Sequence, residues 1–244
     1  MNTVSASPSE VTANEKTSRK ILVWDAPVRL FHWLMVASFA GAWITAESES
    51  WRMVHVTLGY TMAGLVAFRI LWGLVGTRYA RFSSFVRGPS AVVAYVRGIL
   101  QGKPEHHTGH NPAGALAIVA LLGLTVVITA SGWGTFNEIG GKWLEEGHEI
   151  AANVMLALVG AHILGALVSS WLHRENLIGA MISGHKPGRP EEGVRNAWRT
   201  VAAMMLVVVV GFWWMQWKNA PTGAGLADVP VAAANARHGD GHRD

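Results

Sequence analysis

Five stretches of this chain are apolar for long enough to cross a membrane as helices. The hydrocarbon core of a bilayer is about 30 Å thick, which an α-helix spans in roughly 20 residues. The five stretches cover residues 27–46, 53–75, 112–133, 150–172 and 200–217. An amphipathic stretch at residues 89–100 is too short to cross, and we expect it to lie on the inner membrane surface. The pattern predicts an all-α integral membrane protein.

The fifth stretch differs from the other four. Residues 204–214 read MMLVVVVGFWW and are bulky on every side, whereas the first four stretches carry glycine or serine at repeated positions. Small residues let helices pack closely inside a membrane. We therefore expect a four-helix transmembrane bundle made by the first four stretches, with a peripheral fifth helix at its lipid edge.

The amino-acid composition limits which cofactors and binding partners the chain can have. Only 15% of the residues are charged, against about 25% in an average soluble protein, which excludes disorder for most of the chain. The chain has no cysteine, so it has no disulfide, no cysteine-bound zinc or iron–sulfur cluster and no covalently attached haem. A redox cofactor would have to be held by histidine. The net charge of +4 does not indicate nucleic-acid binding, because long apolar runs separate the basic residues.

The basic residues concentrate on alternate sides of the predicted spans, which predicts the orientation of the chain in the membrane. Of the 20 Lys and Arg residues, 14 lie before or at the start of the first span or in the second and fourth connections. By the positive-inside rule, we expect the N-terminus to be cytoplasmic and the C-terminal tail to be periplasmic or otherwise external. We predict four segments: a cytoplasmic polar extension (1–20), the bundle (21–186), a linker with the fifth helix (187–217) and an external tail (218–244).

Four histidines lie within or at the edges of the predicted spans: His32, His55, His148 and His162. Ionisable groups are costly there and usually mark a functional site. His148 and His162 are 14 residues apart, which places both on one helix face with a separation of about 21 Å. His55 lies at the depth of His148, near the outer end, and His32 lies toward the depth of His162. The spacing predicts two histidine pairs, one above the other.

Two histidine pairs in a cysteine-free helical bundle indicate two haem b groups, because imidazole suits iron and each haem needs two axial ligands. Arg29 and Arg52 each precede a paired histidine by three residues, one turn nearer the water, where a haem propionate would point. Arg69 follows His55 by 14 residues and therefore shares its face at about the inner depth. We take all three arginines as candidate haem-binding residues.

Other interpretations of these residues remain open. An intramembrane histidine can serve only as an interhelical hydrogen-bonding residue, and an arginine near a span end often extends toward water. A proton-coupled transporter would use the same histidines, but it gives no reason for the 14-residue spacing. His173 shares a face with His162 and is the alternative inner ligand. In the second connection, His106, His107 and His110 resemble a surface metal cluster.

The four candidate haem ligands, together with several other residues, lie in segments typical of a known family. They read WDAPVRLFHW at 24–33, HVTLG at 55–59, FRILWG at 68–73, GHNPAG at 109–114, HE at 148–149 and AH at 161–162. Over residues 21–186 the chain resembles the bacterial di-haem cytochrome b subunits grouped with the cytochrome b of nickel–iron hydrogenases, and more distantly bacterial cytochrome b561. The resemblance implies His32, His55, His148 and His162 as haem ligands. The polar extension, fifth span and tail depart from the simplest four-helix members.

The expected function is electron transfer rather than catalysis by this chain alone. An iron held by two histidines has no open position for a substrate. The resemblance implies quinone on one side and, on the other, a periplasmic c-type cytochrome, dehydrogenase or hydrogenase subunit. The competing interpretation is a self-sufficient, quinone-linked superoxide oxidase of the cytochrome b561 type.

Overall fold

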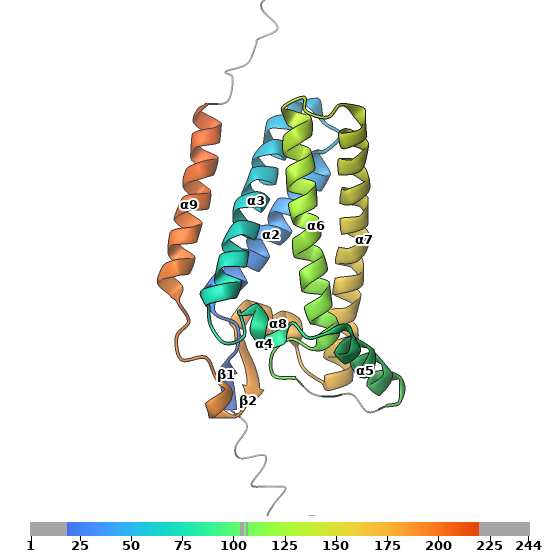
Figure 1. Ribbon diagram of the computed structural model, residues 1–244. Helices are drawn as coiled ribbons and strands as arrows, with labels where there is room; N and C mark the ends of the chain where they lie inside the picture. The colour runs from blue at the N-terminus through green and yellow to red at the C-terminus, as the bar shows by residue number, and fades with distance from the viewer. Residues whose placement is uncertain (1–18, 103–104, 106, 220–244) are drawn as a thin grey trace, which may run out of the picture.

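Five long helices dominate the computed structural model, which describes residues 19–102, 105 and 107–219 (Figure 1). They are α2 (Ala26–Thr45), α3 (Arg52–Val75), α6 (Pro112–Phe136), α7 (Lys142–His173) and α9 (Arg199–Lys218). Each is long and apolar enough to cross a membrane, which confirms the five predicted spans. The predicted extension (1–20) lies mostly outside the described residues, as does the tail (218–244).

One predicted boundary is wrong by two turns. Helix α7 begins at Lys142, eight residues before the predicted start at 150. The added turns contain Glu145, Glu146 and His148, whose polarity hides the helix from a search for apolar runs. An acidic residue in the first turn favours a helix, because it faces the positive end of the helix dipole.

The first four long helices pack in chain order. Helix α2 packs on α3, α3 on α6, and α6 on α7, while α9 packs on α2 and α3 (Figure 1). The buried face of α9 consists of Ala202, Met205 and Val209. Near the C-terminal end of α9, Trp213 Nε1 also donates a hydrogen bond to Thr61 Oγ1 at 2.9 Å. The bulky pattern of residues 204–214 did not predict this polar contact.

Short elements gather at one end of the long helices. They are β1 (Arg19–Leu22), α4 (Phe82–Phe85), α5 (Pro89–Leu100), α8 (Leu177–Ser183), β2 (His185–Gly188) and the 3-10 turn η2 (Pro190–Glu192). We call this the basic end, because the arginine-rich connections lie there. Helix α5 matches the predicted amphipathic stretch. At the opposite, acidic end the connections are short, with a 3-10 turn η1 (Glu49–Trp51).

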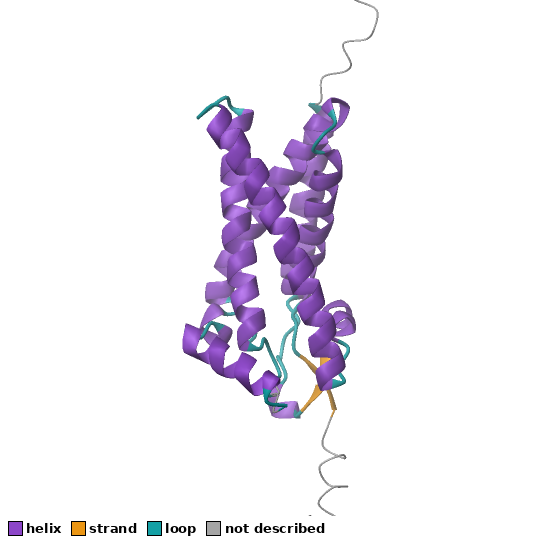
Figure 2. Cartoon of the chain, turned by 90° about the vertical axis from the view of Figure 1, so that its right-hand side faces the viewer, coloured by secondary structure: helices purple, strands orange, loops and turns teal. Residues whose placement is uncertain are grey.

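The two strands were not predicted. They pair antiparallel, with Arg19 opposite Gly188 and Leu22 opposite His185, and both views place them at the basic end (Figures 1 and 2). Four residues are too short to give an alternating pattern that is recognisable in sequence. Strand β2 crosses the boundary predicted between the bundle and the linker at residues 186 and 187.

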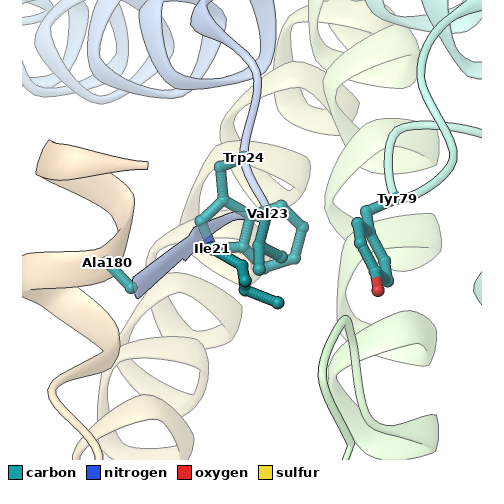
Figure 3. Close-up of a cluster of buried hydrophobic side chains, with 5 residues drawn as sticks. All are labelled: Ile21, Val23, Trp24, Tyr79 and Ala180. Atoms are coloured by element: carbon teal, nitrogen blue, oxygen red, sulfur yellow. The ribbon is translucent and has the colours of Figure 1, made fainter. Parts of the chain in front are cut away.

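A buried hydrophobic cluster joins this sheet to the helices. Figure 3 shows its members, Ile21, Val23, Trp24, Tyr79 and Ala180, which come from the start of the chain, the α3–α4 connection and α8. The Trp24 and Tyr79 rings meet edge to face with centroids 6.4 Å apart. The cluster therefore holds three distant segments together beneath the first helix.

Asp25 connects the start of α2 to the end of α3. Its carboxylate is 1% exposed and accepts three hydrogen bonds: from Val28 N at 2.9 Å, Trp72 Nε1 at 3.0 Å and Thr77 Oγ1 at 2.7 Å. The first of these caps the helix. A buried carboxylate is tolerated only when its oxygens are bonded in this way.

We expect Asp25→Ala to lower the free energy of unfolding by more than about 3 kcal/mol, since it leaves buried donors without an acceptor. Denaturation of the purified protein in detergent measures this change. Glu191→Ala is the control, because Glu191 is an exposed acid at the same end. A loss for Asp25→Ala no larger than that of the control would show that Asp25 does not hold the helices together.

Candidate functional site

Two of the four predicted histidines meet near the acidic end. His55 lies one turn inside α3, and His148 lies on α7 at the same depth. Their ring centroids are 6.2 Å apart, and the ring planes make an angle of 77°. We call them the outer pair. The predicted pairing of His55 with His148 therefore matches the side-chain positions.

Each ring of the outer pair is fixed through its Nδ1 atom. His55 Nδ1 lies 2.8 Å from the carbonyl oxygen of Ala42 on α2, and His148 Nδ1 lies 3.0 Å from that of Ile128 on α6. A carbonyl oxygen only accepts hydrogen bonds, so each Nδ1 carries the proton. In a neutral ring with this hydrogen bond, Nε2 is the unprotonated nitrogen, which is the usual state of a metal-binding histidine.

The separation of the outer pair suits a metal ion between the rings. An imidazole–metal bond of about 2 Å on each side, with about 1 Å from each nitrogen to its ring centre, separates the centroids by roughly 6 Å. The separation of the outer pair therefore agrees with two histidines that would hold one haem iron.

Two small residues on α6 make room for the His148 ring. The Ser131 hydroxyl lies 3.2 Å from His148 Nδ1 and donates its own hydrogen to the Val127 carbonyl at 2.8 Å, so it accepts from the ring. A Cβ atom at Gly132 would lie 2.8 Å from His148 Cε1, too close for any real side chain. The sequence analysis missed both residues, because neither carries a metal-ligating group.

The inner pair is His32 on α2 and His162 on α7. Both side chains are half-buried, and the two rings lie within electrostatic reach of each other. His32 Nδ1 is buried without a hydrogen-bond partner. His173, the alternative inner ligand, is the last residue of α7, three turns beyond His162. The choice of His162 over His173 as the partner of His32 stays a prediction.

Two of the three candidate arginines have buried nitrogens without a partner. Arg29 Nη1 donates to the Ile182 carbonyl at 2.8 Å, but its Nε has no acceptor. Arg69 is 3% exposed, its guanidinium lies 4.9 Å from the Phe82 ring centre, and its Nη1 has no acceptor. Arg52 instead is exposed, 5.9 Å from the Phe136 ring centre. Buried donors require an acceptor, and an anionic group such as a propionate would supply one.

Glycines on the histidine-bearing helices leave open space beside the backbone. A Cβ atom at Gly59 or Gly64 of α3, or at Gly160 or Gly165 of α7, would meet no atom within 4 Å. Such open space would let a flat ring approach these two helices closely.

The proposed surface metal cluster in the second connection has no support. His106 lies outside the described residues. Within the described part of the chain, no group of three or more His, Asp or Glu side chains is placed to hold a metal ion. His110 turns inward instead, with ring centroids 4.5 Å from Trp24 and 4.6 Å from Phe85.

We expect Gly132→Ala to abolish cofactor binding at the outer pair, because the added methyl group displaces the His148 ring. The measurement is the ratio of haem to protein after purification, which should fall by one haem per chain. Gly123→Ala on the same helix is the matched control, since a Cβ atom there meets nothing within 4 Å. Equal haem content in the two variants would contradict the assigned position of His148.

Comparison with known proteins supports a haem protein. The family model described as prokaryotic cytochrome b561 matches residues 23–184. A probable Ni/Fe-hydrogenase 1 B-type cytochrome subunit of Escherichia coli is 22% identical over 212 residues, covering 67% of this chain and 89% of that protein. The probable Ni/Fe-hydrogenase B-type cytochrome subunit of Cupriavidus necator is 24% identical, covering 71% and 90% respectively. No solved structure matches the chain.

The family match covers α2, α3, α6 and nearly all of the chain through α8, including all four candidate histidines on α2, α3 and α7, and it implies haem b as the cofactor. Because it spans more than half of the chain, this protein belongs to the prokaryotic cytochrome b561 family, as a multi-pass membrane cytochrome of the b type.

Proposed function

We propose that this chain carries electrons across the bacterial inner membrane between a periplasmic redox partner and quinone, using two haem b groups. The observation that carries the proposal is the geometry of the outer pair. Its two rings stand 6.2 Å apart, and both Nδ1 atoms are committed to backbone carbonyls. When bound, haem b supplies a one-electron iron couple.

The residues assigned to the two haems lie at different depths. His55 and His148 would hold the outer haem, with Arg52 toward the acidic end. His32 and His162 would hold the inner haem, with Arg29 and Arg69 toward the basic end. Helix α7 contributes to both, and its two histidines are separated by a rise of about 21 Å. Such a spacing extends the redox path over most of the hydrocarbon core.

The charge distribution supports the proposed orientation. The basic end carries the connections rich in arginine, which the positive-inside rule places in the cytoplasm. The N-terminus would then be cytoplasmic and the C-terminus periplasmic. The outer pair would face the periplasmic partner, and the inner pair would lie nearer the cytoplasm.

The relatives suggest the class of partner. They are described as B-type cytochrome subunits of Ni/Fe hydrogenases. We therefore place a hydrogenase-type dehydrogenase subunit first among periplasmic partners, with a c-type cytochrome as the alternative. Quinone would be the partner within the membrane. In this assignment the chain is an electron-transfer subunit of a respiratory oxidoreductase.

The acidic end disfavours the superoxide oxidase alternative. Its exposed side chains include Glu47, Glu49, Glu138, Glu145, Glu146 and Glu149. Superoxide is an anion, and a surface of this sign lowers the rate at which an anion arrives. The non-redox transporter alternative leaves the fixed tautomers of His55 and His148 without a purpose.

Single histidine variants test the assignment of ligands. We expect His32→Ala and His162→Ala to lose one haem, and His55→Ala and His148→Ala to lose the other, because each change removes one of two axial ligands. The ratio of haem to protein and the low-spin ferric EPR signals distinguish the two haems. His173→Ala is the control and should retain both. Loss of the inner haem in that variant, with retention in His162→Ala, would reverse the choice between them.

Removal of α9 tests the proposed four-helix core. A chain ending at Trp198 keeps the Ala197 carbonyl that accepts from Ala26 N at 2.8 Å, and it keeps the Trp198 ring that packs on Trp72. We expect this shortened chain to retain both haems, since α9 contributes none of the assigned residues. Haem content and thermal stability in detergent are measured together. Loss of a haem at unchanged expression would make the fifth helix part of the core.

A further inference from the structure

His110 has a more specific environment than a surface loop residue. It directly precedes Asn111, whose side chain caps α6 by accepting from Gly114 N at 2.7 Å. Its ring lies between Trp24 and Phe85, and its Nδ1 atom is buried without a hydrogen-bond partner. The histidine is therefore held firmly while one of its nitrogens is left without a protein partner.

The surroundings of His110 are positively charged. Burial, followed by the charges of Arg69, Lys186 and His162, lowers the pKa of His110 to about 3. The ring is therefore neutral at physiological pH and has one N–H to donate. Lys186 already forms an ion pair with Glu175 at 2.8 Å. Of the neighbouring cations Lys186 and Arg69, it is Arg69 that has a nitrogen, Nη1, without a hydrogen-bond acceptor.

Four buried nitrogens near the basic end lack a hydrogen-bond partner. They are Arg29 Nε, His32 Nδ1, Arg69 Nη1 and His110 Nδ1. The negative charge of Asp25 acts on Arg69. The Asp25 carboxylate, however, already accepts hydrogen bonds from Val28, Trp72 and Thr77. The region therefore has an excess of donors and positive charge, which an anion with several acceptor sites would balance. A carboxylate offers about four such sites.

We propose that His110 is a positioning residue of the inner haem, which donates its Nδ1–H to a haem propionate beside Arg69. The inference rests on the proposed function and extends it to the α5–α6 connection, outside the membrane-spanning helices. His110 would not bind iron. Its hydrogen bond would offset part of the propionate's negative charge, and that charge otherwise favours the oxidised haem.

His110→Phe tests the inference by removing the donor while keeping an aromatic ring between Trp24 and Phe85. We expect both haems to remain bound. The equilibrium constant for reducing the inner haem should fall three- to tenfold, and a tenfold change is about 59 mV for a one-electron couple. A spectroscopic redox titration measures both haems, and the outer haem should be unchanged. His185→Phe is the control, because His185 is an exposed histidine at the same end.

Two further variants keep the test decisive. His110→Gln retains an N–H donor. Its equilibrium constant for reducing the inner haem should therefore lie between those of wild type and His110→Phe. If the Phe variant does not fold, His110→Leu carries the same prediction with a smaller side chain. Reconstitution with haem dimethyl ester, which lacks the carboxylate charge, should abolish the difference between wild type and variant.

An unchanged inner haem, or equal shifts of both haems, would overturn the inference while leaving the electron-transfer proposal intact. A difference between wild type and variant that persists with the ester would also overturn it, because the acceptor would then be another anion. Wild-type protein without haem would instead refute the proposed function itself.

Discussion

The outer histidine rings are fixed by hydrogen bonds to backbone carbonyls on neighbouring helices. His55 of α3 is fixed by a carbonyl of α2, and His148 of α7 by a carbonyl of α6. Rotation of either ring would break that bond and remove the acceptor of the ring N–H, which is costly inside a membrane. The site therefore depends on the packing of four helices, although only two of them supply the rings.

This dependence explains the order in which the helices pack. Helix α2 lies against α3 and α6 lies against α7, so each outer histidine finds its carbonyl on the neighbour that also precedes it in the chain. Asp25 and Trp72 then fix α2 against α3 at the other end. Small residues at the α6–α7 contact, Ser131 and Gly132, allow the helices to approach closely enough for the His148 bond.

Much of this arrangement is predictable from sequence because its causes act over many residues. Five apolar runs give the spans, and the 14-residue interval between His148 and His162 gives a shared face and two depths. The remaining features depend on local geometry. The Ala42 and Ile128 carbonyls belong to residues without polar side chains, so no residue type marks them. Gly132 has the same appearance as a packing glycine, and His110 looks like a loop residue until Trp24 and Phe85 are placed beside it. The acidic first turns of α7 hid its true start.

The central claim is that two pairs of histidines each close both axial positions of a haem b. The most direct measurement is the haem content of the purified wild-type chain, combined with its optical spectrum in the reduced state before and after addition of carbon monoxide. The account predicts two b-type haems per chain and a spectrum that carbon monoxide does not change, because neither iron has an open position. One haem per chain, or a reduced haem that binds carbon monoxide, would contradict it.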